Sequence, residues 1–325
     1  MADKFVSAES PAPVVERDFD DAEAFLEALH PLRGNWVRDP PLWVFRGQRD
    51  SSWPLVPAAH RPESWASFGF PILRPKHAGA AYEPMIDVEA EYWLYDRYLK
   101  ALDGAGLEIP QMNTWGTPDG EFNRETESWP GGHRIGVLAL AQHYNLPTRL
   151  LDWTWKPRHA AFFAAQGAAS TPKAGKWLEV WALRVDFVRE HGARGINRIT
   201  FSLHEVARAS NPKLHAQSGL FTACRGALGE AENPVALDDI VRMRHRVIAD
   251  DKGTLPHLTY DSPIMYRFRL PQHAAPTLLR LLWFEDVYAA RLFPAHEGVL
   301  QSLKDEHLWD SPAFSARAPT KRGAS

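Results

Sequence analysis

The stretch WVFRGQRDSSWPLVPAAHR places an arginine and a glycine at the end of an apolar run. The run starts with aromatic and β-branched residues, which predicts a strand over 42–46. Arg46 carries a planar fork of donors that pairs bidentately with phosphate. Gly47 has no Cβ, so a pyrophosphate could lie against the backbone, and Gln48 adds a donor and an acceptor. These residues predict a dinucleotide site. The alternative is that Arg46 pairs with a buried carboxylate and Gly47 makes a turn.

A second group of polar residues lies in QHYNLPTRLLDW. Gln142 and His143 end an apolar helix, where the wall of a pocket would need hydrogen bonds, and His143 could bind a ribose hydroxyl or act as acid or base. The alternative for His143 is a satisfied histidine of the core. Thr148 or Asp152 could cap a following helix, and Arg149 could pair with Asp152 three residues later if both are helical.

Four stretches follow one another in the order expected of the FRG domain, which is named for its Phe-Arg-Gly signature. They are FRGQRDSSWPLVPAAHR, LALAQHYNLPTRLLDWTWKPRHAAFFA, NPKLHAQSGLFT and LFPAHEGVLQSL. The chain resembles this family over roughly residues 40–305. A strand that ends aromatic-Arg-Gly is also similar to the first motif of one branch of ADP-ribosyltransferases.

The second resemblance implies that NAD is the substrate and that Arg46 helps to hold it. It implies Thr148 and Thr154 at the nicotinamide pocket and Glu297 as the carboxylate that stabilises positive charge at C1′ when nicotinamide leaves. The alternative for Glu297 is an exposed N-cap of the last helix. We therefore expect Glu297, Arg46 and His143 as catalytic residues. The expected NAD-binding residues are Arg46, Gly47, Gln48, Gln142, Thr148, Arg149 and Phe221, although Phe221 could equally be a core residue after a hairpin turn.

These expectations give one geometric prediction. Residues from separate motifs, with no shared role in folding, should line a single pocket because a ligand requires them together. The predicted set is Arg46, Gln142, His143, Thr148 and Glu297.

Composition limits the partners. The net charge of −3 gives no bulk field that attracts nucleic acid, so an RNA or DNA acceptor would need a local patch such as RMRHRV. The single Cys224 cannot form an intrachain disulfide, and no signal-like start or long apolar run occurs. We expect a cytoplasmic protein with no membrane partner. One cysteine excludes a thiolate metal cage, the histidines form no H-x-x-x-H pair, and no metal site is predicted.

The elements interleave without a regular βαβ rhythm, which predicts an α+β fold with a mixed or antiparallel central sheet flanked by helices. Residues 1–16 are expected to be a flexible arm, 17–310 a single FRG-type domain and 311–325 a disordered basic tail. The Gly- and Pro-rich segment 103–134 is expected to be a long lid-like loop. In 147–169 a turn followed by an apolar helix is expected.

The leading hypothesis is an NAD-dependent ADP-ribosyltransferase-like enzyme. It would be a toxin or phage-defence effector that modifies nucleic acid or protein, with an antitoxin or regulatory protein as partner. A second hypothesis is a non-catalytic nucleotide-sensing or protein-interaction module. A third is a nuclease.

Overall fold

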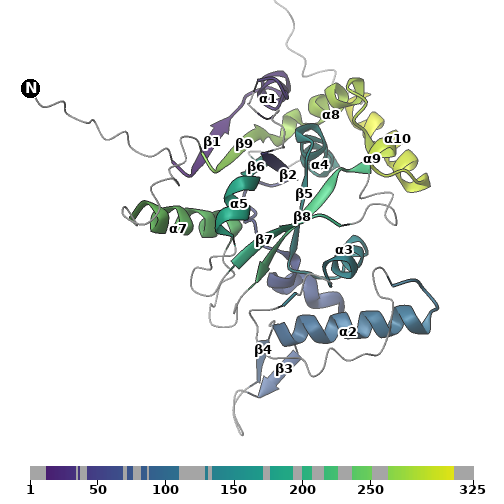
Figure 1. Ribbon diagram of the computed structural model, residues 1–325. Helices are drawn as coiled ribbons and strands as arrows, with labels where there is room; N and C mark the ends of the chain where they lie inside the picture. The colour runs from purple at the N-terminus through teal and green to yellow at the C-terminus, as the bar shows by residue number, and fades with distance from the viewer. Residues whose placement is uncertain are drawn as a thin grey trace, which may run out of the picture.

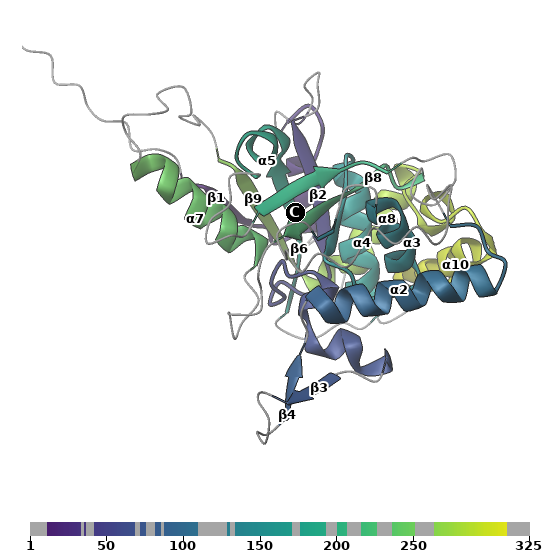
Figure 2. The same ribbon diagram turned by 60° about the horizontal axis from the view of Figure 1, so that its bottom comes forward.

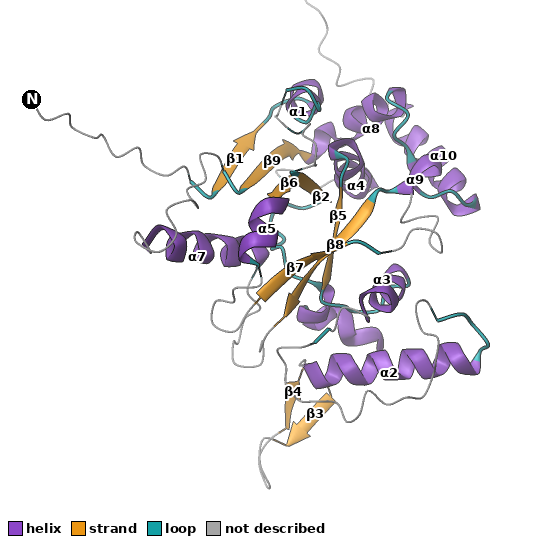
Figure 3. Cartoon of the chain, in the orientation of Figure 1, coloured by secondary structure: helices purple, strands orange, loops and turns teal. Residues whose placement is uncertain are grey.

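The computed structural model describes residues 12–33, 36, 42–68, 72–75, 82–85, 88–109, 129–130, 134–170, 176–192, 200–206, 216–225, 236–250 and 263–310. In this part of the chain a seven-stranded sheet carries helices on both faces (Figures 1 and 3). None of the helices described there is long and apolar enough to cross a membrane.

The sheet is mixed. Its strand order is β1-β9-β6-β2-β5-β8-β7, and all neighbours are antiparallel except β1 and β9. The strands are β1 (Val14–Asp18), β2 (Trp43–Gln48), β5 (Leu150–Thr154), β6 (Trp177–Arg184), β7 (Thr200–His204), β8 (Gly219–Arg225) and β9 (Met265–Pro271). A separate hairpin joins β3 (Ile72–Pro75) to β4 (Tyr82–Met85).

Helices cover the two faces because the strands alternate apolar side chains to either side. One face packs against α1 (Ala22–Ala28), α4 (Pro157–Ser170) and α8 (Ala275–Phe284), and the other against α5 (Val185–His191) and α7 (Leu237–Asp250). Two further helices, α9 (Ala289–Leu292) and α10 (His296–Asp310), follow α8, and α10 packs against both α8 and α9. Short 3₁₀ helices span Ala58–His60, Pro62–Phe68 and Gln272–Ala274.

A third cluster covers the β5–β8 half of the sheet. There α2 (Val88–Gly104) and α3 (Ile135–His143) pack against Leu150 and Phe221. Figure 2 brings this side forward and shows α2 lying beside α3. Helix α3 ends in a Schellman motif, in which Leu146 N–H bonds to Ala141 O and Asn145 adopts a left-handed φ of 64°.

The sheet is split between β2 and β5. The two strands share a single residue pair, Phe45 with Thr154, whereas β2 pairs with β6 along its whole length. Beyond that pair the strands diverge, with α4 packed on the β2 side of the split and α3 on the β5 side.

The α+β class and the mixed sheet are confirmed. The predicted arm over 1–16 is wrong at its end, because Val14, Val15 and Glu16 pair with β9. The predicted lid over 103–134 is wrong at its start, where α2 continues to Gly104, and Trp129 is buried against α2. Residues 1–11, most of the predicted lid (110–128 and 131–133) and the predicted tail lie outside the described residues.

Candidate functional site

A chamber of about 370 Å³ opens at the split between β2 and β5. Its walls come from β2, α3, β5, α4, the start of β8 and the segment after α9, so elements far apart in the sequence meet there. The lining residues are Phe45, Arg46, Gly47, Ala139, Gln142, His143, Asp152, Trp153, Thr154, Ala160, Phe163, Gln217, Gly219, Leu220, Phe221 and Phe293. Its volume lies within the range of small-molecule sites.

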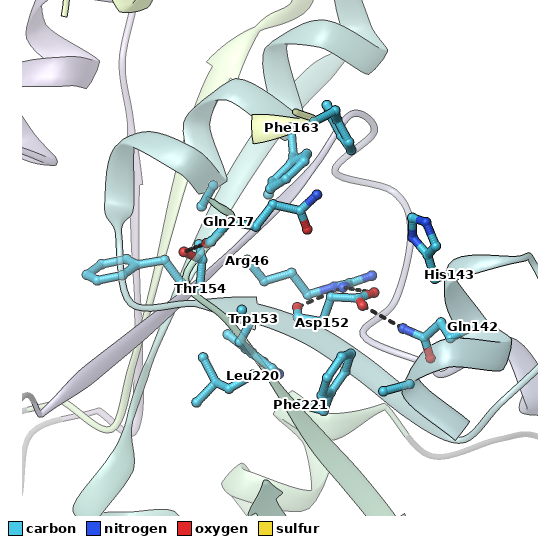
Figure 4. Close-up of a pocket in the computed structure, with 16 residues that line it drawn as sticks. Arg46, Gln142, His143, Asp152, Trp153, Thr154, Phe163, Gln217, Leu220 and Phe221 are labelled. Atoms are coloured by element: carbon cyan, nitrogen blue, oxygen red, sulfur yellow. Dashed lines mark hydrogen bonds and ion pairs between the residues drawn. The ribbon is translucent and has the colours of Figure 1, made fainter. Parts of the chain in front are cut away.

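Arg46 bridges the split. Its neighbours in the strand, Phe45 and Gly47, face α4, so alternation places Arg46 on the opposite face. Its guanidinium reaches across the gap, where Nη1 donates to the main-chain oxygen of Asp152 at 2.9 Å and lies 3.5 Å from the carboxylate (Figure 4). The side chain therefore supplies β5 with a donor where β2 has diverged.

Asp152 presents the carboxylate of the chamber. Its side chain is 63% exposed, whereas that of Arg46 is 15% exposed. Gln142 Nε2 donates to Asp152 Oδ1 at 2.6 Å, and the buried Thr148 hydroxyl donates to Gln142 Oε1. This chain of bonds fixes the amide of Gln142 and holds one carboxylate oxygen, so the orientation of Asp152 is set by residues behind it.

The remaining walls are mostly apolar. In Figure 4, Phe163 and Phe221 lie on opposite sides of the Arg46–Asp152 pair, and His143 lies above Gln142 at the end of α3. Gln217 Nε2 donates to Leu292 O at 3.3 Å, and its main-chain oxygen accepts from Thr154 Oγ1 at 2.7 Å. Aromatic faces with few fixed polar groups suit a planar ring that carries polar edges.

Burial dominates the electrostatics of Arg46. Desolvation lowers the pKa of its guanidinium, Asp152 opposes this effect, and the neighbouring Arg61 adds to the lowering. Nε of Arg46 is buried with no hydrogen-bond partner among the described residues. A second anion, such as a phosphate, would stabilise the charged guanidinium of Arg46, because the carboxylate of Asp152 beside it is largely exposed to solvent.

Residues 41–173 match the family model of the FRG domain. The chain carries an FRG domain. The match covers β2, α3, β5 and α4, the elements that form the split, and ends before the two later stretches of the expected range up to 305. No curated protein and no solved structure matches the chain.

The glycine of the FRG signature packs against a helix. A Cβ on Gly47 would lie 1.9 Å from the main-chain oxygen of Ala160 and 2.9 Å from Ala164 N. The missing side chain thus lets α4 approach β2 closely. Gly47 also lines the chamber, so its contact with a pyrophosphate stays a prediction. Gln48 is also structural, since its buried amide donates to Trp53 O and to Glu179 Oε1, outside the chamber.

Arg149 belongs to a buried ion pair. It is 1% exposed, and Nε and Nη2 each donate to the Glu91 carboxylate at 2.6 Å. The predicted helical pair with Asp152 is wrong because 150–154 is a strand, and the same fact removes Thr148 and Asp152 as helix caps. Arg149 does not line the chamber and cannot bind a cofactor there.

The predicted pocket forms in part. Arg46, Gln142 and His143 line the chamber, as does Phe221. Thr148 does not line it but supports Gln142 from behind, and Glu297 is exposed in the first turn of α10 and is not a lining residue.

Sequence reasoning missed the roles of Asp152, Phe163 and Gln217. An acidic residue in the apolar run LLDWT was a usable signal for Asp152, but its assignment to a helix obscured it. Among the residues that the structure describes, no three His, Cys, Asp or Glu side chains lie close enough to hold a metal ion.

Proposed function

We propose that the chamber binds NAD and that the chain cleaves the bond between nicotinamide and ribose, transferring ADP-ribose to an acceptor. The observation that supports this is the carboxylate of Asp152, held beside Arg46 at the mouth of an aromatic chamber. The similarity of the aromatic-Arg-Gly strand to the first ADP-ribosyltransferase motif supports it independently. Asp152 takes the role expected of Glu297.

The chemistry requires a carboxylate and no metal. The C1′–N1 bond breaks with its electron pair leaving on nicotinamide, and positive charge develops at C1′. A lone pair of the acceptor, which is water in the simplest case, forms the new bond to C1′ and the acceptor releases its proton to solvent. The Asp152 carboxylate would stabilise the developing charge, and Gln142 would hold it in place for this. Arg46 would bind phosphate.

The test is release of nicotinamide from NAD by purified protein, with water, RNA, DNA or a protein lysate as acceptor. Asp152→Asn keeps the shape and the bond from Gln142 but removes the charge. We expect its rate to fall by about two to three orders of magnitude with little change in NAD affinity. Glu297→Gln is the matched control and should retain the wild-type rate, because Glu297 is exposed outside the chamber. If Glu297→Gln loses activity and Asp152→Asn keeps it, the catalytic carboxylate is Glu297 and not Asp152.

One observation favours a second candidate, a nucleotide-binding module without turnover. Arg46 already lies 3.5 Å from the Asp152 carboxylate, which offsets part of the charge that catalysis would use. If wild-type protein binds NAD by calorimetry but releases no nicotinamide with any acceptor, the binding module is the better description.

The role of Arg46 can be tested separately. Arg46→Lys replaces a planar fork with a point charge, so nucleotide affinity should fall while the melting temperature changes little. Arg46→Ala should also remain folded, because the partner carboxylate of Asp152 is 63% exposed and stays solvated. An Arg46→Ala protein that fails to fold would show a structural role instead.

A further inference from the structure

A groove of about 540 Å³ adjoins the chamber. The two cavities share Arg46, Gln142 and Asp152, so these residues form the boundary between them. Its other lining residues come from the 3₁₀ segment before β3, the turn after α3 and β5: Ala58, Arg61, Glu63, Ser64, Ser67, Phe68, Tyr144, Asn145, Leu146, Pro147, Leu150 and Leu151.

Two arginines face this groove. Arg61 donates from Nε to Val56 O at 2.8 Å, which fixes the plane of its guanidinium, and its terminal nitrogens bind no other residue that the structure describes. Arg46 and Arg61 lie close enough that Arg61 lowers the pKa of Arg46, and Asp152 is the carboxylate that both share. Asp152 is 63% exposed and Glu63 is also exposed, so solvent screens both carboxylates more than it screens the two partly buried guanidinium groups. A phosphate that enters the groove can therefore compete with them for the arginines.

Neutral donors and one carboxylate complete the polar part of the groove. Ser64, Ser67 and Asn145 offer hydroxyl and amide hydrogens to a phosphate or a ribose. Burial lowers the pKa of Arg61, and the exposed Glu63 opposes this effect. Glu63 therefore competes with a bound phosphate for the guanidinium of Arg61.

Two exposed aromatic rings line the same groove. Tyr144 is 67% exposed and Phe68 is 38% exposed, although each belongs to a segment with a well-packed apolar side. Exposed rings beside arginines are the arrangement on which nucleic-acid bases stack.

We propose that the groove binds the adenosine-phosphate half of a dinucleotide, with phosphate at Arg61 and the base stacked against Tyr144, while the other half occupies the chamber. The inference rests on the proposed function in one respect, which is that the chamber holds the nicotinamide half. The proposal specifies a dinucleotide as the class of ligand and assigns Arg61 and Tyr144 as the residues that select it.

The experiment measures calorimetric affinities of three probes: ADP, which can occupy only the groove half, nicotinamide mononucleotide, which can occupy only the chamber half, and NAD. We expect Arg61→Gln and Tyr144→Ala each to weaken ADP and NAD by about tenfold or more and to leave nicotinamide mononucleotide unchanged. Tyr144→Phe keeps the ring and should retain affinity. Arg280→Gln is the matched control, because Arg280 is an exposed arginine of α8 that lines neither cavity.

The outcomes separate the two proposals. If wild-type protein binds ADP through Arg61 but neither binds nor cleaves NAD, the groove remains an adenosine-phosphate site and the proposed function is overturned. If NAD and nicotinamide mononucleotide bind with equal affinity, and Arg61→Gln changes neither affinity, the proposal for the groove is overturned and the proposed function remains. No binding of any probe would overturn both.

Discussion

Replacing Gly47 with alanine tests whether the signature glycine serves packing or ligand binding. The new Cβ would lie 1.9 Å from Ala160 O, whereas ordinary van der Waals contact begins at 3.4 Å. Helix α4 would therefore have to retreat by about 1.5 Å, the difference of those two distances. The atoms met are main-chain atoms of α4, which cannot rotate away as a side chain could.

The energetic cost follows from close packing. Protein interiors resist expansion, and inserting a methyl group into a filled core costs about 1–3 kcal/mol, occasionally more. We expect Gly47→Ala to lie at the upper end, about 3 kcal/mol, because three backbone atoms lie within 3 Å of the new carbon. In a domain of about 300 residues that cost lowers the melting temperature by roughly 5 °C.

The assay is thermal and urea denaturation, with Gly104→Ala as the control. Gly104 is the last residue of α2, and a Cβ there meets no heavy atom within 4 Å. Its replacement should leave stability unchanged or raise it by less than about 1 kcal/mol. A Gly47→Ala protein that melts with the wild type but no longer binds NAD would refute the packing role and restore the ligand role.

Two further predictions concern the buried ion pair of Arg149 with Glu91 and the histidine beside it, His60. Arg149→Met should cost about 3–5 kcal/mol in urea denaturation, because it leaves the Glu91 carboxylate buried and unpaired; the double variant with Glu91→Leu should recover most of this. The control Lys100→Ala breaks an exposed helical pair and should cost less than about 1 kcal/mol. Burial and the nearby Arg149 lower the pKa of His60 to about 3, so the unfolded chain takes up a proton from about pH 6.5 downward and the folded chain does not. Between pH 7.5 and 5 the wild type should thus lose about 2 kcal/mol more stability than His60→Gln, and equal losses would contradict this.

Part of the site was predictable because its residues interrupt clear local patterns. Arg46 follows an aromatic and β-branched run, and Gln142 and His143 end an apolar run of helical length. Both runs form the expected elements, as β2 and α3. A charged or amide side chain at the end of such an element needs a polar partner or a cavity, and that requirement is visible in the sequence.

The rest depends on contacts between distant residues. LLDWT becomes β5 because it pairs with β8, about 70 residues later, and nothing within the stretch itself separates a buried strand from the start of a helix. Arg149 finds Glu91 at a separation of 58 residues, so local spacing pointed to the wrong partner, Asp152. Gln217 and Phe293 reach the chamber only through the way that β8 and α9 are placed around α4.

The three residues of the Phe-Arg-Gly signature have separate tasks that together produce the chamber. Phe45 forms the last pair with β5 and packs into the core under α4. Gly47 holds α4 close to β2, on the far side of the split from α3. Arg46, between them, points to the other face and bonds to the β5 backbone across the gap. Because a strand alternates its faces, only consecutive positions can pack against the helix on one side and bridge the split from the other. The signature therefore lies where the sheet opens and also places a charge beside the opening, so the same three residues line the chamber.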